Sequence, residues 1–544
     1  MTALLAALPI LLVLGLMVGL GWPAARAGLA GAGLALGIAV VGFGLGTDVL
    51  PEVGLAGSLL GVAAEAAFTS ATILWIILPA LAIYHLQVAT GGTDVLRVAL
   101  GQLSGDPRVL ALLIGWFFAL FMEGGAGFGS SVALAAPFLV GVGYQPLAAV
   151  VIAMIGHMIG VSFGAIGTPI VPMAAASGLA PLELSAATAT YHLAFGWIPP
   201  IVVVLIATRA VGGRLTGAIW GWTALAAAAF LVPMWTIATF IGPELPTLGG
   251  SLFGGAIFVA ALLVVRRRNG AAAAIATSPT ATDGPSDAPS IVEPRADDPS
   301  AAPASVAPLP DPDRVPTGTG ALLRAGAPYL ILIGLVVVTR LVPAVADPLN
   351  TVVLDWQLQG PFAGSMSPLT HPGTLLVVAF LLGAVVQRVP AATVRQALGT
   401  TLRQLVPVTV ALVAMLLLAR VMVRSGMTEV LAEAAANSTA AAWPVLAPFV
   451  GVLGTFVTGS ATASNVLFTD LQVATAEKLG YPTLPLLGAQ NVGAAVGNPI
   501  APHNIVAGGA TVGLVGAEAP VMRGTILTVV GYALLGGLLA LLLV

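Results

Sequence analysis

Four short stretches of the chain combine glycine or proline with hydroxyl and amide side chains inside long apolar runs. Gly124–Ser131 and Gly459–Asn465 are rich in Gly and Ser, while Gly167–Pro172 and Gly497–Pro502 read GTPIVP and GNPIAP. Hydroxyls, amides and free N–H groups at the start of a half-helix can hold a small carboxylate without a full cation. The expected ligand-binding residues are Ser130, Ser131, Thr168, Ser460, Thr462, Ser464, Asn465, Asn498, His503 and Asn504. Each of them can equally cap its own broken helix.

Ionisable residues lie close to these stretches. Glu123 ends an apolar run that begins near Val109, and an ionisable group at membrane depth is a functional candidate by default. We expect Glu123 to exchange a proton or to organise a ligand; the alternative is a structural partner for free backbone amides. His157 and His503 flank the two Gly-x-Pro breaks, where a protonated imidazole can relay a proton or hold a carboxylate. The alternative for either is an ordinary hydrogen bond within a helical bundle. For Glu65 we favour a structural role.

Gly160–Gly164 matches the G-x-S-x-G pattern of serine hydrolases, with Ser162 as nucleophile and His157 and His192 nearby in the sequence. That pattern needs a strand–turn–helix elbow and an acidic partner, whereas here it lies in an apolar helical run. An intramembrane serine hydrolase is therefore a remote alternative. The chain has no cysteine and neither an H-E-x-x-H motif nor a P-loop, so we expect no metal and no cofactor.

The surrounding chain is built to lie in a membrane. Of its 544 residues 58% are hydrophobic and only 8% charged, with a mean hydropathy of +1.04, whereas soluble domains carry about 25% charged residues. Apolar runs long enough to cross a bilayer recur along the whole length, and we interpret the first, Leu4–Leu20, as a membrane helix rather than a cleaved signal. The sequence predicts an all-α polytopic protein of the cell membrane with about twelve transmembrane helices. We expect no nucleic-acid partner.

An internal repeat links the four breaks. Gly167 and Gly497 are 330 positions apart, as are Gly129 and Gly459. Gly and Pro interrupt the helical hydrogen-bond ladder, so each half should contain broken helices or re-entrant hairpins. Paired interruptions in two halves are a sequence marker of a transporter's binding site. We predict two inverted repeats, with cores at about residues 109–208 and 440–543.

Composition and charge divide the chain into three parts. Residues 1–265 and 323–544 form two transmembrane halves, and 266–322 is rich in Pro, Ala and Asp, which predicts a disordered linker. The linker opens with three arginines at 266–268, a cytoplasmic marker. The other basic loops then place the N-terminus outside. Arg340, Arg420 and Arg424 lie near helix ends, where we expect them to snorkel.

The motifs themselves resemble one family. The run EGGAGFGSSVALAAPFLVGVGYQPLAAVVIAM from Glu123, followed by FGAIGTPIVP from Phe163, is similar to the lactate permeases. So is GSATASNVLFTDLQ from Gly459, followed by NPIAPHNI from Asn498. The resemblance implies symport of lactate, and of glycolate, with protons across the cell membrane. A small organic anion and a proton would then be the cargo.

The chain departs from that family's pattern at three positions. Ala461 stands where an acidic residue is usual, and Asn498 and His503 stand where Lys and Gln are usual. These changes leave a carrier of another organic anion, with sodium as the coupling ion, as an alternative. The oligomeric state stays open.

Overall fold

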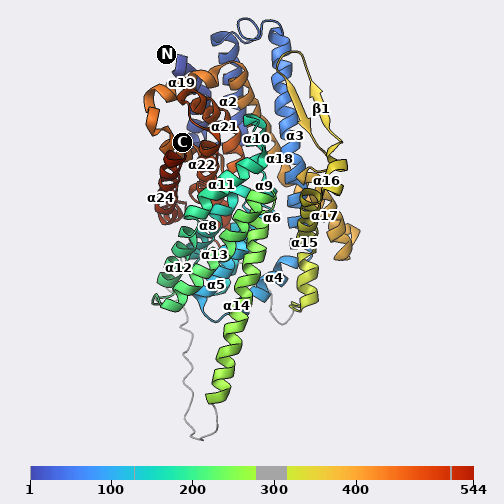
Figure 1. Ribbon diagram of the computed structural model, residues 1–544, viewed down its shortest axis with the longest axis vertical. Helices are drawn as coiled ribbons and strands as arrows, with labels where there is room; N and C mark the ends of the chain where they lie inside the picture. The colour runs from blue at the N-terminus through green and yellow to red at the C-terminus, as the bar shows by residue number, and fades with distance from the viewer. Residues whose placement is uncertain (1, 128, 277–314, 515–517) are drawn as a thin grey trace.

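A computed structural model describes residues 2–127, 129–276, 315–514 and 518–544 (Figure 1). Within these residues, ten helices are long and apolar enough to cross a bilayer, or eleven if the bent pair α11 (Pro181–Phe195) and α12 (Ile198–Ala210) forms one span. The prediction of an all-α polytopic membrane protein is confirmed. The count is lower than the expected twelve partly because the first apolar helix, Thr2–Met17, is short.

The helices outside the two expected cores form two groups along the chain. Before the first core lie α1 (Thr2–Leu14), the π-helical turn η1 (Gly15–Gly19), α2 (Ala24–Gly42), α3 (Gly54–Ala89) and α4 (Gly92–Gly101). Between the cores lie α13 (Gly217–Phe240), α14 (Pro246–Ala276), α15 (Thr319–Leu341), α16 (Pro343–Asn350), the antiparallel strands β1 (Leu354–Gln357) and β2 (Ala363–Met366), α17 (Pro372–Val386), α18 (Ala391–Arg424), α19 (Met427–Thr439) and the 3-10 turn η5 (Ala440–Ala442).

The elements of the two cores follow the same order along the chain. In each core a helix, a break, a second helix, a loop and a third helix are followed by another break and the closing helices. The first core contains α5 (Pro107–Ala111), the π-helical η2 (Leu112–Phe118), α6 (Ala119–Gly125), α7 (Ser130–Gly141), α8 (Pro146–His157), the 3-10 helix η3 (Met158–Phe163), α9 (Gly164–Gly167), α10 (Ile170–Ser177), α11 and α12. The second contains α20 (Trp443–Thr458), α21 (Ala461–Leu479), α22 (Thr483–Val496), the 3-10 turn η6 (Asn498–Ile500), α23 (Pro502–Ala510) and α24 (Glu518–Leu543).

Glycines let the backbones of the core helices touch. A Cβ on Gly156 of α8 would lie 1.7 Å from the carbonyl oxygen of Gly115 in η2. In the second core, a Cβ on Gly493 of α22 would lie 1.8 Å from the carbonyl oxygen of Pro448 in α20. Membrane helices associate through such small residues because lipid supplies no hydrophobic drive between them. The many glycines of the sequence therefore serve helix packing at equivalent places in both cores.

Helices of the two cores also pack against each other in reciprocal pairs. α10 packs on α21 while α23 packs on α7, and α11 packs on α22 while α24 packs on α8. In each case the second contact joins the counterparts of the helices in the first. A two-fold relation between the cores produces contacts of this kind, because each contact is repeated with the partners exchanged.

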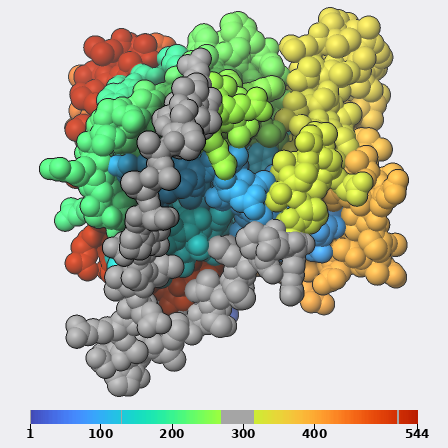
Figure 2. Space-filling view, turned by 90° about the horizontal axis from the view of Figure 1, so that it is seen from below, coloured from blue at the N-terminus to red at the C-terminus, as the bar shows by residue number. Residues whose placement is uncertain are grey.

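Four elements of the first half that carry arginines reach one end of the molecule. α4, α5, α12 and the C-terminal part of α14 all reach the lower part of Figure 1, and they carry Arg97, Arg108, Arg209 and Arg266. The N-terminus lies near the opposite end. The orientation expected from the positive-inside rule has this lower end facing the cytoplasm, and that expectation stays a prediction. Figure 2, viewed from this end, shows the green helices of the first half beside the yellow and orange helices that follow them in the chain.

The predicted linker at 266–322 differs from the structure at its two boundaries. α14 continues through the arginines to Ala276, and α15 already begins at Thr319. The extension of α14 contains the run NGAAAAIA, and alanine is the strongest helix former. Residues 277–314 lie outside the described residues, so the rest of the linker prediction stays untested.

Candidate functional site

The first break in each core is the tip of a helical hairpin. In the first core, α7 returns to the side from which α5 started, because the Tyr144 hydroxyl beyond α7 donates a hydrogen bond of 2.8 Å to the carbonyl of Pro107. In the second, Trp443 at the start of α20 donates to Gln472 of α21 at 2.9 Å. Each hairpin thus has its two ends together, as the predicted re-entrant hairpins require.

The second break of the first core has unusual backbone geometry. Ala165, Ile166 and Gly167 have φ values of 43°, 59° and 77°, so three consecutive residues are left-handed. This conformation is strained for a β-branched side chain such as that of Ile166, and such strain costs of order 1–3 kcal/mol per residue. It persists at functional sites where the surroundings over-determine it. This segment is therefore a marked feature of the candidate site.

Glu123 connects the two breaks of the first core. The hydroxyl of Ser131, the second residue of α7, donates a hydrogen bond to the carboxylate of Glu123, a residue that is 4% exposed. On its other side the carboxylate meets Gly164, where a Cβ would lie 2.4 Å from the Glu123 Oε1 atom. Glu123 therefore joins the hairpin tip to the strained segment, through a hydroxyl on one side and bare backbone on the other.

Contacts between the cores join the breaks of one half to those of the other. The Thr462 and Thr168 hydroxyls lie 3.4 Å apart, and Asn465 donates to the Pro169 carbonyl at 2.9 Å. His157 Nε2 lies 3.2 Å from the Asn498 Oδ1 atom, which must accept this hydrogen bond. These contacts join residues that are 294, 296 and 341 positions apart, and so they bring the breaks of the two cores together.

Several expected ligand-binding residues use their side chains within their own core. Ser130 donates to the Gly127 carbonyl, Ser460 accepts from the Ala463 amide, and Ser464 donates to the Gly451 carbonyl. Asn504 donates to the Gly459 carbonyl at 3.2 Å and so holds the second hairpin tip against α23. His503 is exposed, and its ring packs beside Gly459. Helix capping, the alternative considered from the sequence, describes Ser460, whose hydroxyl caps the start of α21.

A buried polar chain between the cores was not predicted from the sequence. Ser162 Oγ lies 2.8 Å from His192 Nε2, and His192 Nδ1 lies 2.9 Å from the Tyr532 hydroxyl. Asn491 of α22 donates to the Ser162 carbonyl and accepts from Asn465. The signal in the sequence was the adjacent Gln490 and Asn491 within an apolar helix, since polar residues there join neighbouring helices.

The same chain excludes the hydrolase alternative. Ser162 does meet a histidine, but the other nitrogen of His192 faces a tyrosine hydroxyl instead of a carboxylate. Ser162, His192 and Tyr532 are each 0% exposed, so no substrate reaches the serine. The arrangement lacks the acidic partner and the access that nucleophilic catalysis requires.

Two arginines expected to snorkel instead form ion pairs with buried carboxylates. Arg424 binds both oxygens of Glu65, and Arg340 binds Glu244. The snorkelling prediction is wrong for these two arginines, because each guanidinium has a protein carboxylate within reach. The structural role expected for Glu65 agrees with its complete pairing. Arg420 has a buried Nε atom without a partner among the described residues.

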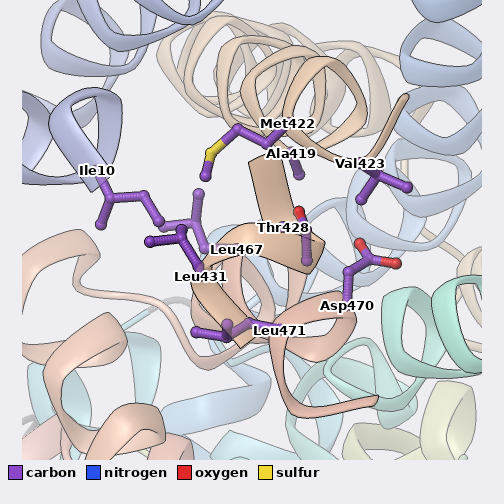
Figure 3. A pocket seen from close by; sticks show the side chains of 9 residues that line it. All are labelled: Ile10, Ala419, Met422, Val423, Thr428, Leu431, Leu467, Asp470 and Leu471. Atoms are coloured by element: carbon purple, nitrogen blue, oxygen red, sulfur yellow. The ribbon is translucent and has the colours of Figure 1, made fainter. Parts of the chain in front are cut away.

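A small cavity lies between α1, α18, α19 and α21 (Figure 3). Thr428 and Asp470 are its polar side chains, and the rest of its lining is apolar. None of the residues expected to bind a ligand lines it. The candidate site is therefore the junction of the four breaks rather than this cavity.

Four helices begin at the four breaks. α7 starts at Ser130, α10 at Ile170, α21 at Ala461 and α23 at Pro502. The first N–H groups of a helix have no partner within it, and the helix dipole is positive at that end. Helix starts with hydroxyl and amide neighbours form a neutral site that favours an anion. The fold and this site define a polytopic membrane transporter with discontinuous helices at its centre.

Comparison with known proteins identifies the family. The family model for L-lactate permease matches residues 2–544. The L-lactate permease of Streptococcus iniae is 30% identical over 75% of this chain and 78% of its own length, and the glycolate permease GlcA of Escherichia coli is 28% identical over 86% and 84%. Among solved structures, the YdaH transporter of Alcanivorax borkumensis has a TM-score of 0.48 at 15% identity over 96% of this chain and 98% of that one. This chain belongs to the L-lactate permease family, and it is a transporter rather than an enzyme.

Proposed function

We propose that this protein is a secondary carrier that takes up small 2-hydroxy monocarboxylates, such as lactate or glycolate, together with protons. The observation that carries the proposal is the start of four helices at four breaks that contact one another across two cores. Relatives named for lactate and for glycolate support the class of cargo.

Neutral donors would hold the carboxylate. The hydroxyls of Thr168 and Thr462 lie on opposite cores beside the helix starts, and Asn498 lies at the fourth break. Together with free backbone N–H groups, they can accept an anion and orient its 2-hydroxyl. The other serine and asparagine residues expected to bind a ligand would shape the breaks through the hydrogen bonds already described.

Glu123 and His157 are the proposed coupling residues of this site. An anion entering beside Glu123 would meet a like charge unless the carboxylate had bound a proton. His157 contacts Asn498 of the other core, so a change of its protonation would act on the contact between the cores. Proton and anion would then be carried together.

Alternating access would follow from the two-fold relation of the cores. The reciprocal packing of α7, α8, α10 and α11 with α23, α24, α21 and α22 supports the proposed inverted repeats. In such carriers, one repeat or bundle moves around a site that keeps its place. The breaks would close that site alternately toward each side.

The test is uptake of labelled lactate and glycolate into proteoliposomes, with an inward proton gradient that is imposed and then collapsed. We expect accumulation that depends on the gradient and is lost in Glu123→Gln. No accumulation of either acid by correctly inserted protein would overturn the assignment of cargo. Accumulation driven by a sodium gradient alone would overturn the assignment of the coupling ion.

A further inference from the structure

The turn between α13 and α14 is packed inside the protein. Residues 242–250 are all buried. The Pro243 carbonyl oxygen would lie 2.6 Å from a Cβ on Gly167, and the Leu248 nitrogen 2.5 Å from a Cβ on Gly124. The Thr247 hydroxyl donates to the Gly160 carbonyl at 2.8 Å. The turn and the first residues of α14 therefore contact both breaks of the first core. The contacts join backbone to backbone, because Gly124 and Gly167 have no side chain in the way.

Glu244 is the ionisable residue of that turn. It is 3% exposed, and its Oε1 atom accepts a hydrogen bond from Arg340 of α15. Its Oε2 atom is buried and has no hydrogen-bond partner among the described residues. A buried carboxylate oxygen left without a partner is costly while the group is ionised. A proton bound at this oxygen neutralises the carboxylate and so removes the charge that makes its burial costly.

A second ion pair in the same protein provides the contrast. Glu65 is 6% exposed, and Arg424 donates to both of its oxygens. Arg424 also donates to the Pro361 carbonyl at 3.0 Å and lies over the Phe362 ring. Both oxygens of Glu65 thus have hydrogen-bond partners, as expected for a structural ion pair. In the Glu244 pair, only one carboxylate oxygen has a partner among the described residues.

The charges around Glu244 are few. α13, η3 and α9, which all pack against α14, contain no charged residue, and α6 contributes Glu123. α15 contributes Arg340, whose side chain is 32% exposed, compared with 4% for the side chain of Glu244. His371 lies near enough to Arg340 for the guanidinium charge, added to burial, to lower the pKa of its imidazole to about 4. Arg340 is therefore the partner that balances Glu244.

We propose that Glu244 binds a coupling proton and that the release of Arg340 then offers a positive charge to the anion. The inference rests on the proposed function and adds a proton site outside the residues assigned above. A proton on Oε2 neutralises Glu244, and the incoming carboxylate replaces it as the counter-charge of Arg340. The net charge of the Glu244 and Arg340 pair with its anion is zero before and after, so this exchange binds one proton for each monocarboxylate. The contacts of the turn with Gly124 and Gly167 connect this exchange to the breaks.

Glu244→Gln tests the proposal, with Glu65→Gln as the matched control. A proton gradient of one pH unit drives about tenfold accumulation of a monocarboxylate at 1:1 coupling. We expect Glu244→Gln to lose this accumulation while lactate counterflow remains measurable and no longer depends on pH. Glu65→Gln should still accumulate lactate about tenfold. Accumulation by Glu244→Gln at the wild-type level would overturn the proposal.

A second measurement does not require transport. Lactate added to purified protein in weakly buffered detergent should cause proton uptake that a pH indicator reports. We expect this uptake in the wild type and in Glu65→Gln, and its loss in Glu244→Gln while lactate still binds. Equal proton uptake in all three proteins would overturn the proposal. A wild type that neither binds nor accumulates lactate would overturn the proposed function itself.

Discussion

The hydroxyl of Ser131 donates a hydrogen bond to the carboxylate of Glu123 across the tip of the first hairpin. The corresponding position of the second core, 330 residues later, is Ala461, which has no hydroxyl. The two hairpin tips therefore differ chemically although their helices follow the same order. One tip holds a carboxylate in place, whereas the other presents neutral groups, among them the Thr462 hydroxyl and the Asn465 amide.

Ser131→Ala should slow lactate uptake by about tenfold or more, because a hydrogen bond to a charged group contributes about 1.5–3 kcal/mol. Initial uptake rates in proteoliposomes at a fixed proton gradient measure this. Ser177→Ala is the control, since the Ser177 hydroxyl makes only local bonds among the described residues. It donates to the Met173 carbonyl of its own helix and accepts from the Leu179 amide. Equal rates for Ser131→Ala and the wild type would show that this bond does not support transport.

Gly164→Ala should abolish most uptake and lower the thermal stability. The new Cβ would lie 2.4 Å from the Glu123 Oε1 atom, and overpacking of this kind costs about 1–3 kcal/mol. The φ of Gly164 is −63°, which any residue adopts, so the effect would come from the contact rather than from backbone strain. Gly221→Ala in α13 is the control, because no atom lies within 4 Å of its added Cβ. Normal uptake by Gly164→Ala would mean that Glu123 is free to move aside.

His192→Phe should destabilise the protein by about 1–3 kcal/mol for each hydroxyl left without a partner. The hydroxyls that lose His192 are those of Ser162 and Tyr532, which are completely buried. Ser162 keeps the Asn491 carbonyl at 3.4 Å, so the Tyr532 hydroxyl is the one left without a partner among the described residues. Thermal unfolding in detergent measures the loss, and Tyr532→Phe, which removes one end of the chain, should lower the midpoint less. A midpoint unchanged in His192→Phe would contradict a stabilising role for this polar chain.

Acid should destabilise the protein through His371. Burial and the nearby charge of Arg340 lower the pKa of this imidazole to about 4, whereas the unfolded chain has the ordinary value of about 6.5. Between these values the unfolded state binds more protons, so the stability falls as the pH drops from about 6.5 to about 4. His371→Asn keeps an acceptor for the Gly373 amide and should flatten this part of the curve of midpoint against pH. The same slope in both proteins would assign the acid sensitivity to another group.

Much of the architecture could be predicted from the sequence. Apolar runs longer than a bilayer is thick leave few options but membrane helices, because unpaired backbone groups are not tolerated in lipid. Proline marks helix breaks locally because it lacks an N–H donor, and glycine marks them because it readily adopts a left-handed φ. Gly129 and Gly459, with φ of 82° and 71°, thus located both hairpin tips without any knowledge of packing. The motif around Glu123 pointed to the family for the same reason, since it is contiguous in the chain.

Only the tertiary structure decided which partners these residues meet. Glu244 lies in a short turn with no periodicity, and nothing in the sequence indicates that the turn is buried against Gly124 and Gly167 or that Arg340 reaches it. The Ser162, His192 and Tyr532 chain joins residues that are 30 and 340 positions apart. Contacts between elements so distant in the chain depend on how helices pack, and packing is set by the shapes of many side chains at once. Composition, spacing and local breaks determine that helices form and where they stop, whereas the pairing of buried charges arises only when the helices meet.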